Sequence, residues 1–516
     1  MVESLKSKYR QDSYVQQPLS YVQKRSGEQW LIGYDSQQLH KVIEEYCQQL
    51  SQLSQEKAPK ILLAEQNPLK FLAAFVAAVT SNCHLFLGNP HWVQPEWQQV
   101  LNQIHPDLII GELASIHEPS TLNNQHSRLN NKYSIINNQP SALIMIPTGG
   151  SSGKIRFAIH TWETLMASVA GFHQYFGNKP VNSFCVLPLY HVSGLMQFMR
   201  SLTTGGRMVI LPFKALKAGE GRDIDPKEFF ISLVPTQLAK LINQDAADWL
   251  SRFRTVLLGG APAWESLLTQ ARQDRIPLAL TYGMTETASG VVTLKPKDFL
   301  SGNSANSANN NSCGHVLPHA KVTIRNASGE IVEANQTGVI TIEAKSLFHG
   351  YYSASTNLAL ESELSKFPNR VQTLQSDDLG YFDQQGYLYT VGRRSNKIIT
   401  GGENVFPAEV EQVIRGTGLV SDVCVIGLPD DYWGQVVTAV FVPSSDQVSV
   451  AMVQQNVEGN LSKFKCPKNW LAVESLPRNG QGKLNYQQVK VIARDCLIDT
   501  LRPGRTGILA SLRGLV

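Results

Sequence analysis

The sequence of 516 residues lacks a large surplus of either charge and has no Cys-x-x-Cys pair. Its 46 lysines and arginines stand against 42 acidic residues, a net charge of +4, which is too small for a nucleic-acid surface or a polybasic membrane patch. The seven cysteines are scattered without a Cys-x-x-Cys pair, which argues against a disulfide framework and a zinc site. We therefore expect no nucleic-acid partner and a reducing, cytoplasmic location.

Long apolar runs are also missing. The longest uninterrupted one, residues 71–79, is far shorter than the roughly 20 residues that span a bilayer, and the N-terminus has no apolar segment of a secretory signal. Hydrophobic residues make up 42% of the chain and charged residues 17%, unlike the composition of disordered proteins. The sequence thus predicts a globular protein without a membrane span, long enough for two to four folding units.

Short apolar, β-branched runs alternate with segments of helical spacing. Strands are predicted at 60–64, 142–146, 184–187 and 255–258, and helices at 69–79 and 162–172. This alternation is typical of βαβ units around parallel sheets, so the fold class is α/β. The two Asn-rich stretches, 122–140 and 301–312, have no apolar period and are predicted to be exposed loops.

The hydropathy pattern of the chain changes after residue 301. Short segments in which apolar and polar residues alternate, such as 321–324 and 338–342, indicate a small β subdomain. A basic turn at 393–397 precedes about 120 residues that read as a compact α+β unit, a usual domain size. We expect a large N-terminal domain, 1–394, with βαβ-type sheets and the β subdomain, and a smaller α+β C-terminal domain, 395–516.

A Gly- and hydroxyl-rich loop follows the strand predicted at 142–146. Glycines leave backbone N–H groups free to face an anion, and hydroxyls and a lysine add donors, so such loops bind phosphates. The loop is not a Walker A motif, because only three residues separate Gly149 from Gly153 and Ile155 follows Lys154. Taken alone, it could equally be a flexible turn.

Further motifs resolve this ambiguity. Residues 281–287, 376–381 with 391–393, 401–411 and 479–483, together with the loop, resemble the ordered core motifs of the adenylate-forming acyl-CoA synthetase superfamily. Members of that superfamily join a carboxylate to ATP as an acyl-adenylate and then pass the acyl group to a thiol. The resemblance implies ATP, Mg²⁺ and coenzyme A as small-molecule partners, and a C-terminal domain that rotates about a hinge near Ser395.

The resemblance also implies roles for individual residues. Glu286 would hold Mg²⁺, Asp378 would accept the ribose hydroxyls, and Arg393 would lie near phosphate and ribose oxygens. The catalytic Lys483 would reach the α-phosphate, where a fixed cation offsets developing charge. Gly401 and Gly402 would line the coenzyme A channel. The remaining ATP/AMP-binding residues are Thr148, Gly149, Gly150, Ser151, Ser152, Gly153, Lys154, Gly260, Tyr282, Gly283 and Thr285. Without that context, Asp378 would be interpreted as an acidic residue in a turn and Lys483 as a solvent-exposed lysine.

The acyl pocket is expected around residues 187–200. The segments 149–154, 190–194 with Arg200, 232–237, 258–262 and 282–289 together most resemble the o-succinylbenzoate-CoA ligases of menaquinone and phylloquinone synthesis. Their substrate has a second, aromatic carboxylate, which a fixed arginine suits. Ser193 and Arg200, seven residues apart, match that use, as does Ser289, and His191 would form a gate between the acyl and pantetheine sites. A core histidine and a surface arginine are the structural alternatives.

Three alternatives and several departures from the family pattern stay open. The chain could activate another aryl acid or a fatty acid, or be a non-catalytic nucleotide-binding relative, although the intact Glu286 and Lys483 argue against the last. No carrier-protein signature follows Lys483, so free coenzyme A is the expected acceptor. Ile155 stands where a proline is usual, Ser395 and Asn396 where acidic or basic hinge residues are common, and Gly290 where many members have Gln.

Overall fold

The computed structural model describes residues 17–53, 58–111, 142–149, 155–301, 311–353, 372–401, 403–430, 432–458, 460–478 and 484–500. Its internal contacts group the chain into two units, each built from separated segments. The first unit comprises 1–147, 157–210 and 348–370, and the second comprises 148–156, 211–347 and 371–516.

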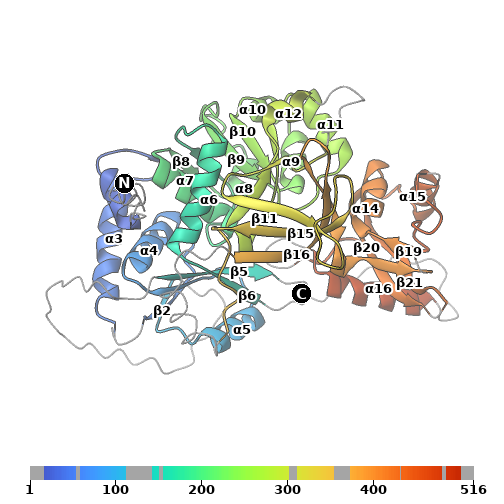
Figure 1. Ribbon diagram of the computed structural model, residues 1–516, viewed down its shortest axis with the longest axis horizontal. Coiled ribbons are helices and arrows are strands. Elements are labelled where there is room, and N and C mark those ends of the chain that lie inside the picture. The colour runs from blue at the N-terminus through green and yellow to red at the C-terminus, as the bar shows by residue number, and fades with distance from the viewer. Residues whose placement is uncertain are drawn as a thin grey trace, which may run out of the picture. The chain divides into compact units, whose positions relative to one another are not determined.

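The first unit combines helices with strands that mostly pair in parallel (Figure 1). Its helices are α2 (Pro18–Lys24), α3 (Ser36–Leu50), α4 (Pro68–Thr80), α5 (Gln94–Ile104), α6 (Trp162–Tyr175) and α7 (Val192–Thr204). Its strands are β1 (Leu31–Ile32), β2 (Lys60–Leu63), β3 (His84–Leu87), β4 (Leu108–Ile110), β5 (Leu143–Gly149), β6 (Ile155–His160), β7 (Asn182–Cys185) and β8 (Met208–Ile210).

Two groups of strands organise this unit. One sheet has the order β4-β2-β3-β5-β6, in which β2 pairs in parallel with β3 and β4, and β3 pairs in parallel with β5. The second group, β1-β8-β7, is parallel. The apolar run at 71–79 lies in α4, where every residue from Phe71 to Val79 is buried, so its hydrophobicity serves packing. The strand predicted at 184–187 lies two residues earlier, because the backbone of Ser183–Cys185 pairs with Met208–Ile210.

The second unit contains parallel and antiparallel strands. Its helices are α8 (Phe213–Lys217), α9 (Pro235–Ile242), α10 (Ala247–Ser251), α11 (Glu265–Gln273), α12 (Pro296–Ser301), α14 (Pro407–Gly416), α15 (Val450–Val457) and α16 (Tyr486–Thr500), with 3₁₀ turns η1 (Thr285–Thr287) and η2 (Arg394–Asn396). Its strands up to the β subdomain are β9 (Phe229–Leu233), β10 (Thr255–Leu258), β11 (Leu278–Met284), β12 (Ser289–Thr293) and β13 (His315–Val316). β9, β10 and β11 are parallel, and β12 and β13 continue antiparallel.

The small β subdomain is a four-stranded antiparallel sheet in the order β14-β15-β16-β17. It consists of β14 (Ala320–Arg325), β15 (Gly338–Ala344), β16 (Gln372–Phe382) and β17 (Leu388–Arg393). The alternating segments at 321–324 and 338–342 predicted it correctly. The Asn-rich stretch 122–140 and most of 301–312 lie outside the described residues.

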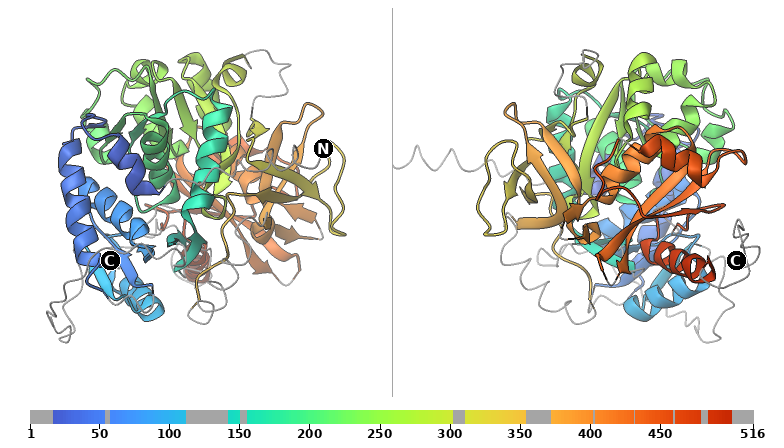
Figure 2. Two further views of the ribbon diagram at one scale, coloured as in Figure 1. Left: turned by 60° about the vertical axis from the view of Figure 1, so that its left-hand side comes forward. Right: turned by 90° about the vertical axis from the view of Figure 1, so that its right-hand side faces the viewer.

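The segment after Arg394 forms a β hairpin, a second small sheet and helices. The strands are β18 (Ile398–Thr400), β19 (Glu403–Val405), β20 (Val420–Asp430), β21 (Gly434–Pro443) and β22 (Asn469–Ala472), with β20-β21-β22 in one sheet. Val489 and Ala493 of α16 join the same apolar cluster as Cys424 and Ile426 of β20, so α16 covers that sheet, as Figure 2 shows. The mixed α/β class and the α+β character of the C-terminal segment are confirmed.

Candidate active site

The predicted acyl-site residues of the first unit lie on or next to helix α7. His191 is the N-cap residue of this helix, and its ring lies 4.6 Å from that of Tyr190, centroid to centroid. Ser193 and Arg200 are seven residues apart and therefore share one face of the helix. The side-chain amide of Gln197, on the same face, donates to the Ser193 carbonyl oxygen at 2.9 Å.

Arg200 is a buried cation. Only 4% of its surface is exposed, and its guanidinium carbon lies 3.9 Å from the centroid of the Phe172 ring on α6. Burial lowers the pKa of Arg200 to about 9, so the side chain keeps its charge at neutral pH. The alternative of a solvated surface arginine is therefore wrong. A charge held inside a protein is costly unless it has a partner or a function.

The C-terminal end of α7 is fixed by a residue that sequence reasoning missed. The buried Arg25 donates to the carbonyl oxygens of Ser201 and Gly206, at 3.0 and 2.6 Å. A cation at this end of a helix is favoured by the helix dipole and satisfies carbonyls that have no partner in the helix. No pattern around Arg25 in the sequence marks this role.

The predicted nucleotide-binding residues of the second unit meet at β11, β16 and β17. The phenol of Tyr282 donates to Asp378 Oδ2 at 3.0 Å, and Arg393 Nε lies 3.3 Å from Asp378 Oδ1. Asp378 and Arg393 are directly opposite each other on the paired strands. Burial, followed by the charge of Asp378, raises the pKa of the Tyr282 phenol, which keeps the phenol protonated as a donor.

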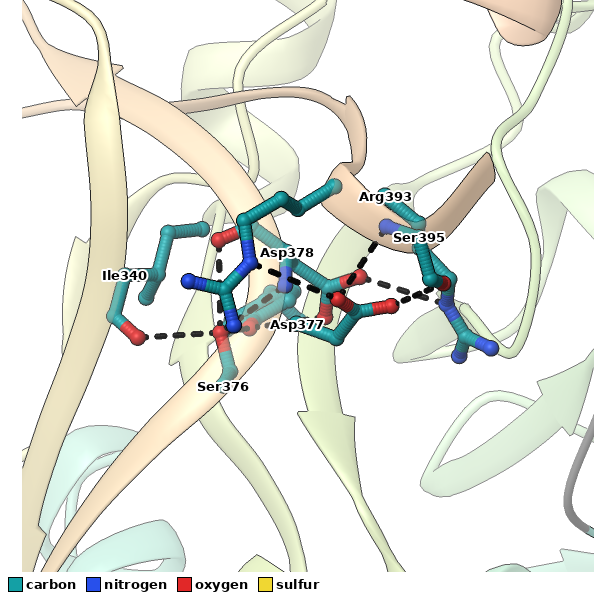
Figure 3. A network of polar contacts seen from close by, with 8 residues as sticks. Ile340, Ser376, Asp377, Asp378, Arg393 and Ser395 are labelled. Atoms are coloured by element: carbon teal, nitrogen blue, oxygen red, sulfur yellow. Dashed lines mark hydrogen bonds and ion pairs between the residues drawn. The ribbon is translucent and has the colours of Figure 1, made fainter. Parts of the chain in front are cut away.

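Ser376 supports this cluster and was not predicted from the sequence. Its hydroxyl accepts the backbone N–H of Asp378 at 3.1 Å and donates to the Ile340 carbonyl oxygen at 2.9 Å. Figure 3 shows these contacts side by side with the Asp378–Arg393 pair. Asp378 is thus held through its backbone N–H and through both oxygens of its carboxylate.

Glu286 lies on the 3₁₀ turn η1, which the buried Thr287 closes. The Thr287 hydroxyl accepts the Met284 backbone N–H at 2.9 Å, and Ala288 and Ser289 after it have φ values of 51° and 90°, in the region that non-glycine residues rarely adopt. Backbone strain of this kind clusters at functional sites. A Cβ at Gly283 would lie 2.1 Å from the Ser289 carbonyl oxygen, so only glycine fits beside this turn.

The side chains of the described residues can bind a magnesium ion only if a phosphate ligand supplies further oxygens. Among the residues that the structure describes, no group of three or more His, Cys, Asp and Glu side chains could hold a metal ion. Mg²⁺ at phosphoryl-transfer sites is usually bound by one or two carboxylates and by substrate phosphates. Glu286, which is partly exposed, can supply one such carboxylate.

Of the phosphate loop, the structure describes Thr148 and Gly149, whereas Gly150, Ser151, Ser152, Gly153 and Lys154 lie outside the described residues. Thr148 is buried, and its hydroxyl has no hydrogen-bond partner in the described part of the chain. A buried hydroxyl without a partner is uncommon and fits a position that a ligand oxygen completes. Gly260 has φ +82°, and Thr285 begins η1.

The predicted coenzyme A channel and the catalytic lysine are only partly described. Gly401 has φ +57°, and a Cβ there would lie 2.8 Å from the Trp433 ring. Lys468 Nζ lies 3.2 Å from the centroid of a Trp433 ring. Gly402 and Lys483 are outside the described residues. Arg478 and Leu484, on either side of Lys483, form an antiparallel bridge, and Arg478 pairs with Asp422 of β20.

Comparison with known proteins decides the family. The profile described as "AMP-binding enzyme" matches residues 34–352, more than half of the chain, and the profile described as "AMP-binding enzyme C-terminal domain" matches 409–483. The chain belongs to the AMP-binding enzyme family. This confirms the resemblance to adenylate-forming acyl-CoA synthetases that the ordered motifs indicated.

Two curated relatives carry the same name. The chain is 27% identical over 471 residues to a 2-succinylbenzoate–CoA ligase from Bacillus cereus, which covers 89% of this chain and 93% of the relative. It is 33% identical over 351 residues to a 2-succinylbenzoate–CoA ligase from Listeria monocytogenes, which covers 66% of this chain and 68% of the relative.

A solved structure agrees with them. The o-succinylbenzoate CoA synthetase (MenE) from Bacillus subtilis, in complex with the acyl-adenylate intermediate OSB-AMP, has a TM-score of 0.76 and 25% identity. The match covers 91% of this chain and 97% of that one. None of the helices in the described part of our chain combines the length and apolarity that a membrane crossing needs.

Proposed function

We infer that this member of the AMP-binding enzyme family is a 2-succinylbenzoate–CoA ligase, which converts 2-succinylbenzoate, ATP and coenzyme A to succinylbenzoyl-CoA, AMP and pyrophosphate. This is the function expected from the sequence, and it agrees with the name of the relatives that match most of the chain. The reaction belongs to menaquinone and phylloquinone synthesis. We place the protein in the cytoplasm, where its seven cysteines would stay reduced.

The observation that carries this choice of acid is Arg200. A fatty acid offers no second charge to a guanidinium that is 4% exposed, whereas the aromatic carboxylate of 2-succinylbenzoate does. An arginine binds a carboxylate with two parallel or water-bridged hydrogen bonds. We assign Ser193, Arg200 and Ser289 to the acid, and His191 to the wall between the acyl and pantetheine sites.

In the first step, an oxygen of the aliphatic carboxylate attacks the α-phosphorus of ATP. The bond from this phosphorus to the bridging oxygen breaks, and pyrophosphate leaves. Asp378, held by Tyr282 and Ser376, would orient the ribose, and Arg393 would lie near ribose and phosphate oxygens. Lys483 would stabilise the charge that develops on the α-phosphate in the transition state. A Mg²⁺ ion bound with ATP would be held by Glu286 and would neutralise phosphate charge.

In the second step, the coenzyme A thiolate attacks the acyl carbon and AMP leaves. The channel for the thiol would pass Gly401 and Gly402. We propose that the segment 395–516 acts as a mobile domain that turns about Ser395 between the steps, so that Lys483 and the glycine loop serve one site in succession. Steps of this kind depend on a hinge of few residues.

An acid-dependent pyrophosphate-release assay over 2-succinylbenzoate, benzoates and fatty acids tests the proposal. We expect release with 2-succinylbenzoate, and coenzyme A-dependent AMP release after it. 4-Phenyl-4-oxobutanoate, which lacks the aromatic carboxylate, is the matched control and should be a poor substrate. Equal activity with that control, or a preference for a fatty acid, would assign the chain to another acyl-CoA synthetase. No release with any acid would favour a non-catalytic relative.

A further inference from the structure

The turn that contains the predicted hinge residue is held by an aspartate of the neighbouring strand. Asp377 of β16 directs both carboxylate oxygens at the 3₁₀ turn η2. Its Oδ1 accepts the backbone N–H of Ser395 at 3.2 Å and lies 3.8 Å from Arg394 Nε. Its Oδ2 accepts the Ser395 hydroxyl. Figure 3 shows the two contacts to Ser395 beside the Asp378–Arg393 pair. We call Asp377, Arg394 and Ser395 the hinge clasp.

The two adjacent aspartates have different partners. Consecutive residues of a strand point to opposite sides, and here Asp378 faces Arg393 and Tyr282 whereas Asp377 faces η2. The ribose-binding carboxylate is therefore not the group that holds the turn. Substitution of Asp377 can remove the clasp without removing the contacts of Asp378.

The clasp acts on the residue that we predict to be the hinge. Ser395 binds Asp377 through its own N–H and its own hydroxyl, so any large change of the backbone angles at residues 394 and 395 breaks at least one of these bonds. Hinges are residues that absorb such changes in φ and ψ. The bonds thus stabilise the present conformation of the turn against every other one.

We propose that Asp377 is a positioning residue that controls how easily the C-terminal segment leaves the conformation in which Asp377 binds the turn η2 at Ser395. This rests on the proposed two-step function, in which the segment serves each step in a different orientation. The clasp would set the ratio of the rates of adenylate formation and thiol transfer. It also accounts for Ser395, which stands where hinge residues of other types are common: its short hydroxyl reaches an acceptor that this chain supplies itself.

The main competing explanation is that Asp377 only stabilises a surface turn. All three clasp residues are at least partly exposed, where a single charged contact contributes little to stability. A turn-stabilising aspartate would change the thermal midpoint slightly and affect both half-reactions equally. The two explanations therefore predict different effects on the ratio of the rates of the two half-reactions.

The test compares Asp377→Ala, Asp377→Asn and Ser395→Ala with a matched control, Asp383→Ala. Asp383 lies at the other end of the same β16–β17 hairpin and also accepts two backbone N–H groups, from Gln385 and Tyr387, both at 2.9 Å. Adenylate formation and coenzyme A transfer from a supplied acyl-adenylate are measured separately. We expect Asp377→Ala and Ser395→Ala to shift the ratio of the two rates in the same direction, by about threefold to tenfold.

Asp377→Asn keeps an oxygen acceptor without the charge, so its ratio should lie between those of the wild type and Asp377→Ala. Asp383→Ala should leave the ratio unchanged. The double variant Asp377→Ala with Ser395→Ala should shift the ratio no further than Asp377→Ala, because both changes break the same contact. An unchanged ratio, or opposite shifts in the two single variants, would overturn the proposal.

Limited trypsin digestion gives a readout that needs no enzyme activity. Cleavage after Arg393 or Arg394, identified by mass, requires the turn to open, so Asp377→Ala should be cut there about threefold to tenfold faster than the wild type and Asp383→Ala. Faster cleavage with an unchanged ratio would also overturn the proposal. If the wild type released no pyrophosphate with any acid, the proposed function would fail, and equal cleavage rates would still refute the clasp.

Discussion

The phenol of Tyr282 donates a hydrogen bond to the carboxylate of Asp378 at 3.0 Å, although the two residues are 96 positions apart in the sequence. Tyr282 is 8% exposed, and its strand β11 belongs to a different sheet from β16. The bond therefore couples the orientation of the carboxylate that we propose to bind the ribose to the neighbouring sheet of the same unit.

We predict that Tyr282→Phe weakens the use of ATP more than that of the acid. A hydrogen bond to a charged group contributes about 1.5–3 kcal/mol, so kcat/KM for ATP should fall by about tenfold while the KM for 2-succinylbenzoate changes less than twofold. Initial rates at varied ATP and varied acid measure both. Tyr389→Phe is the matched control, because Tyr389 donates to Asp383 in the same hairpin at 3.3 Å. An equal loss in the two variants would contradict the role of the Tyr282 bond.

The sequence motifs name three residues that the structure brings together, but they do not show how these residues contact one another. Tyr282, Asp378 and Arg393 follow from ordered motifs, and the strands and helices follow from apolar periodicity. Ser376 and Asp377 were missed because their roles depend on register. The pairing of β16 with β17 shifts between Leu379 and Gly380, and simple alternation along a strand cannot reveal such a bulge.

Arg200 illustrates the same limit on helix α7. The neighbouring residues Met196, Phe198 and Met199 are apolar, which makes full exposure of Arg200 less favourable, but its position over Phe172 depends on how α6 and α7 pack. The tether of Arg25 to the end of α7 joins residues 176 and 181 positions apart, and no local pattern contains it. Long-range contacts of single polar side chains are decided by tertiary packing.

His84 should make the stability of the first unit sensitive to acid. Burial, and then the charge of Lys60, lowers the pKa of His84 from 6.5 to about 4 in the folded protein. Between these values the unfolded chain binds more protons than the folded one, so stability is lost as the pH falls from about 6.5 towards 4. The loss approaches about 3 kcal/mol at the end of this window.

Urea midpoints at pH 7 and pH 5 test this prediction, with His84→Gln as the variant that cannot take up the proton. The wild-type midpoint should fall more between the two pH values than that of the variant, whatever their difference at pH 7. Parallel losses in the two proteins would show that other groups dominate the acid sensitivity.

We predict that Lys483→Ala abolishes adenylate formation and leaves coenzyme A transfer from a supplied acyl-adenylate largely intact. A contact made in only one transition state affects only that step. A bulky residue at Gly402 should do the reverse by filling the thiol channel. Lys490→Ala, a change of a lysine that lies on α16, is the control and should affect neither step. Equal loss of both half-reactions in the Lys483 and Gly402 variants would count against alternation of the C-terminal segment.

Arg200→Met should separate stability from function. Because burial lowers the pKa of Arg200, the folded state disfavours the charged form, and this cost is fully present at every pH below about 9. It is relieved only as the pH rises from about 9 towards the ordinary pKa of an arginine. At pH 7 an apolar side chain of similar length removes the cost, and such replacements of buried charges are often neutral or stabilising. We therefore expect a thermal midpoint equal to or above that of the wild type.

The same substitution should impair the use of 2-succinylbenzoate, because its second carboxylate loses a charge-assisted contact of about 1.5–3 kcal/mol. The kcat/KM for the acid should fall by about tenfold or more, while the KM for ATP stays within about twofold. Arg200→Lys keeps the charge but not the planar pair of donors, so its activity should lie between the two. With 4-phenyl-4-oxobutanoate, which has no second carboxylate, the wild type and Arg200→Met should be equally slow. A loss of thermal stability together with unchanged kcat/KM for 2-succinylbenzoate would make Arg200 a structural residue of the α6–α7 contact and remove it from the substrate site.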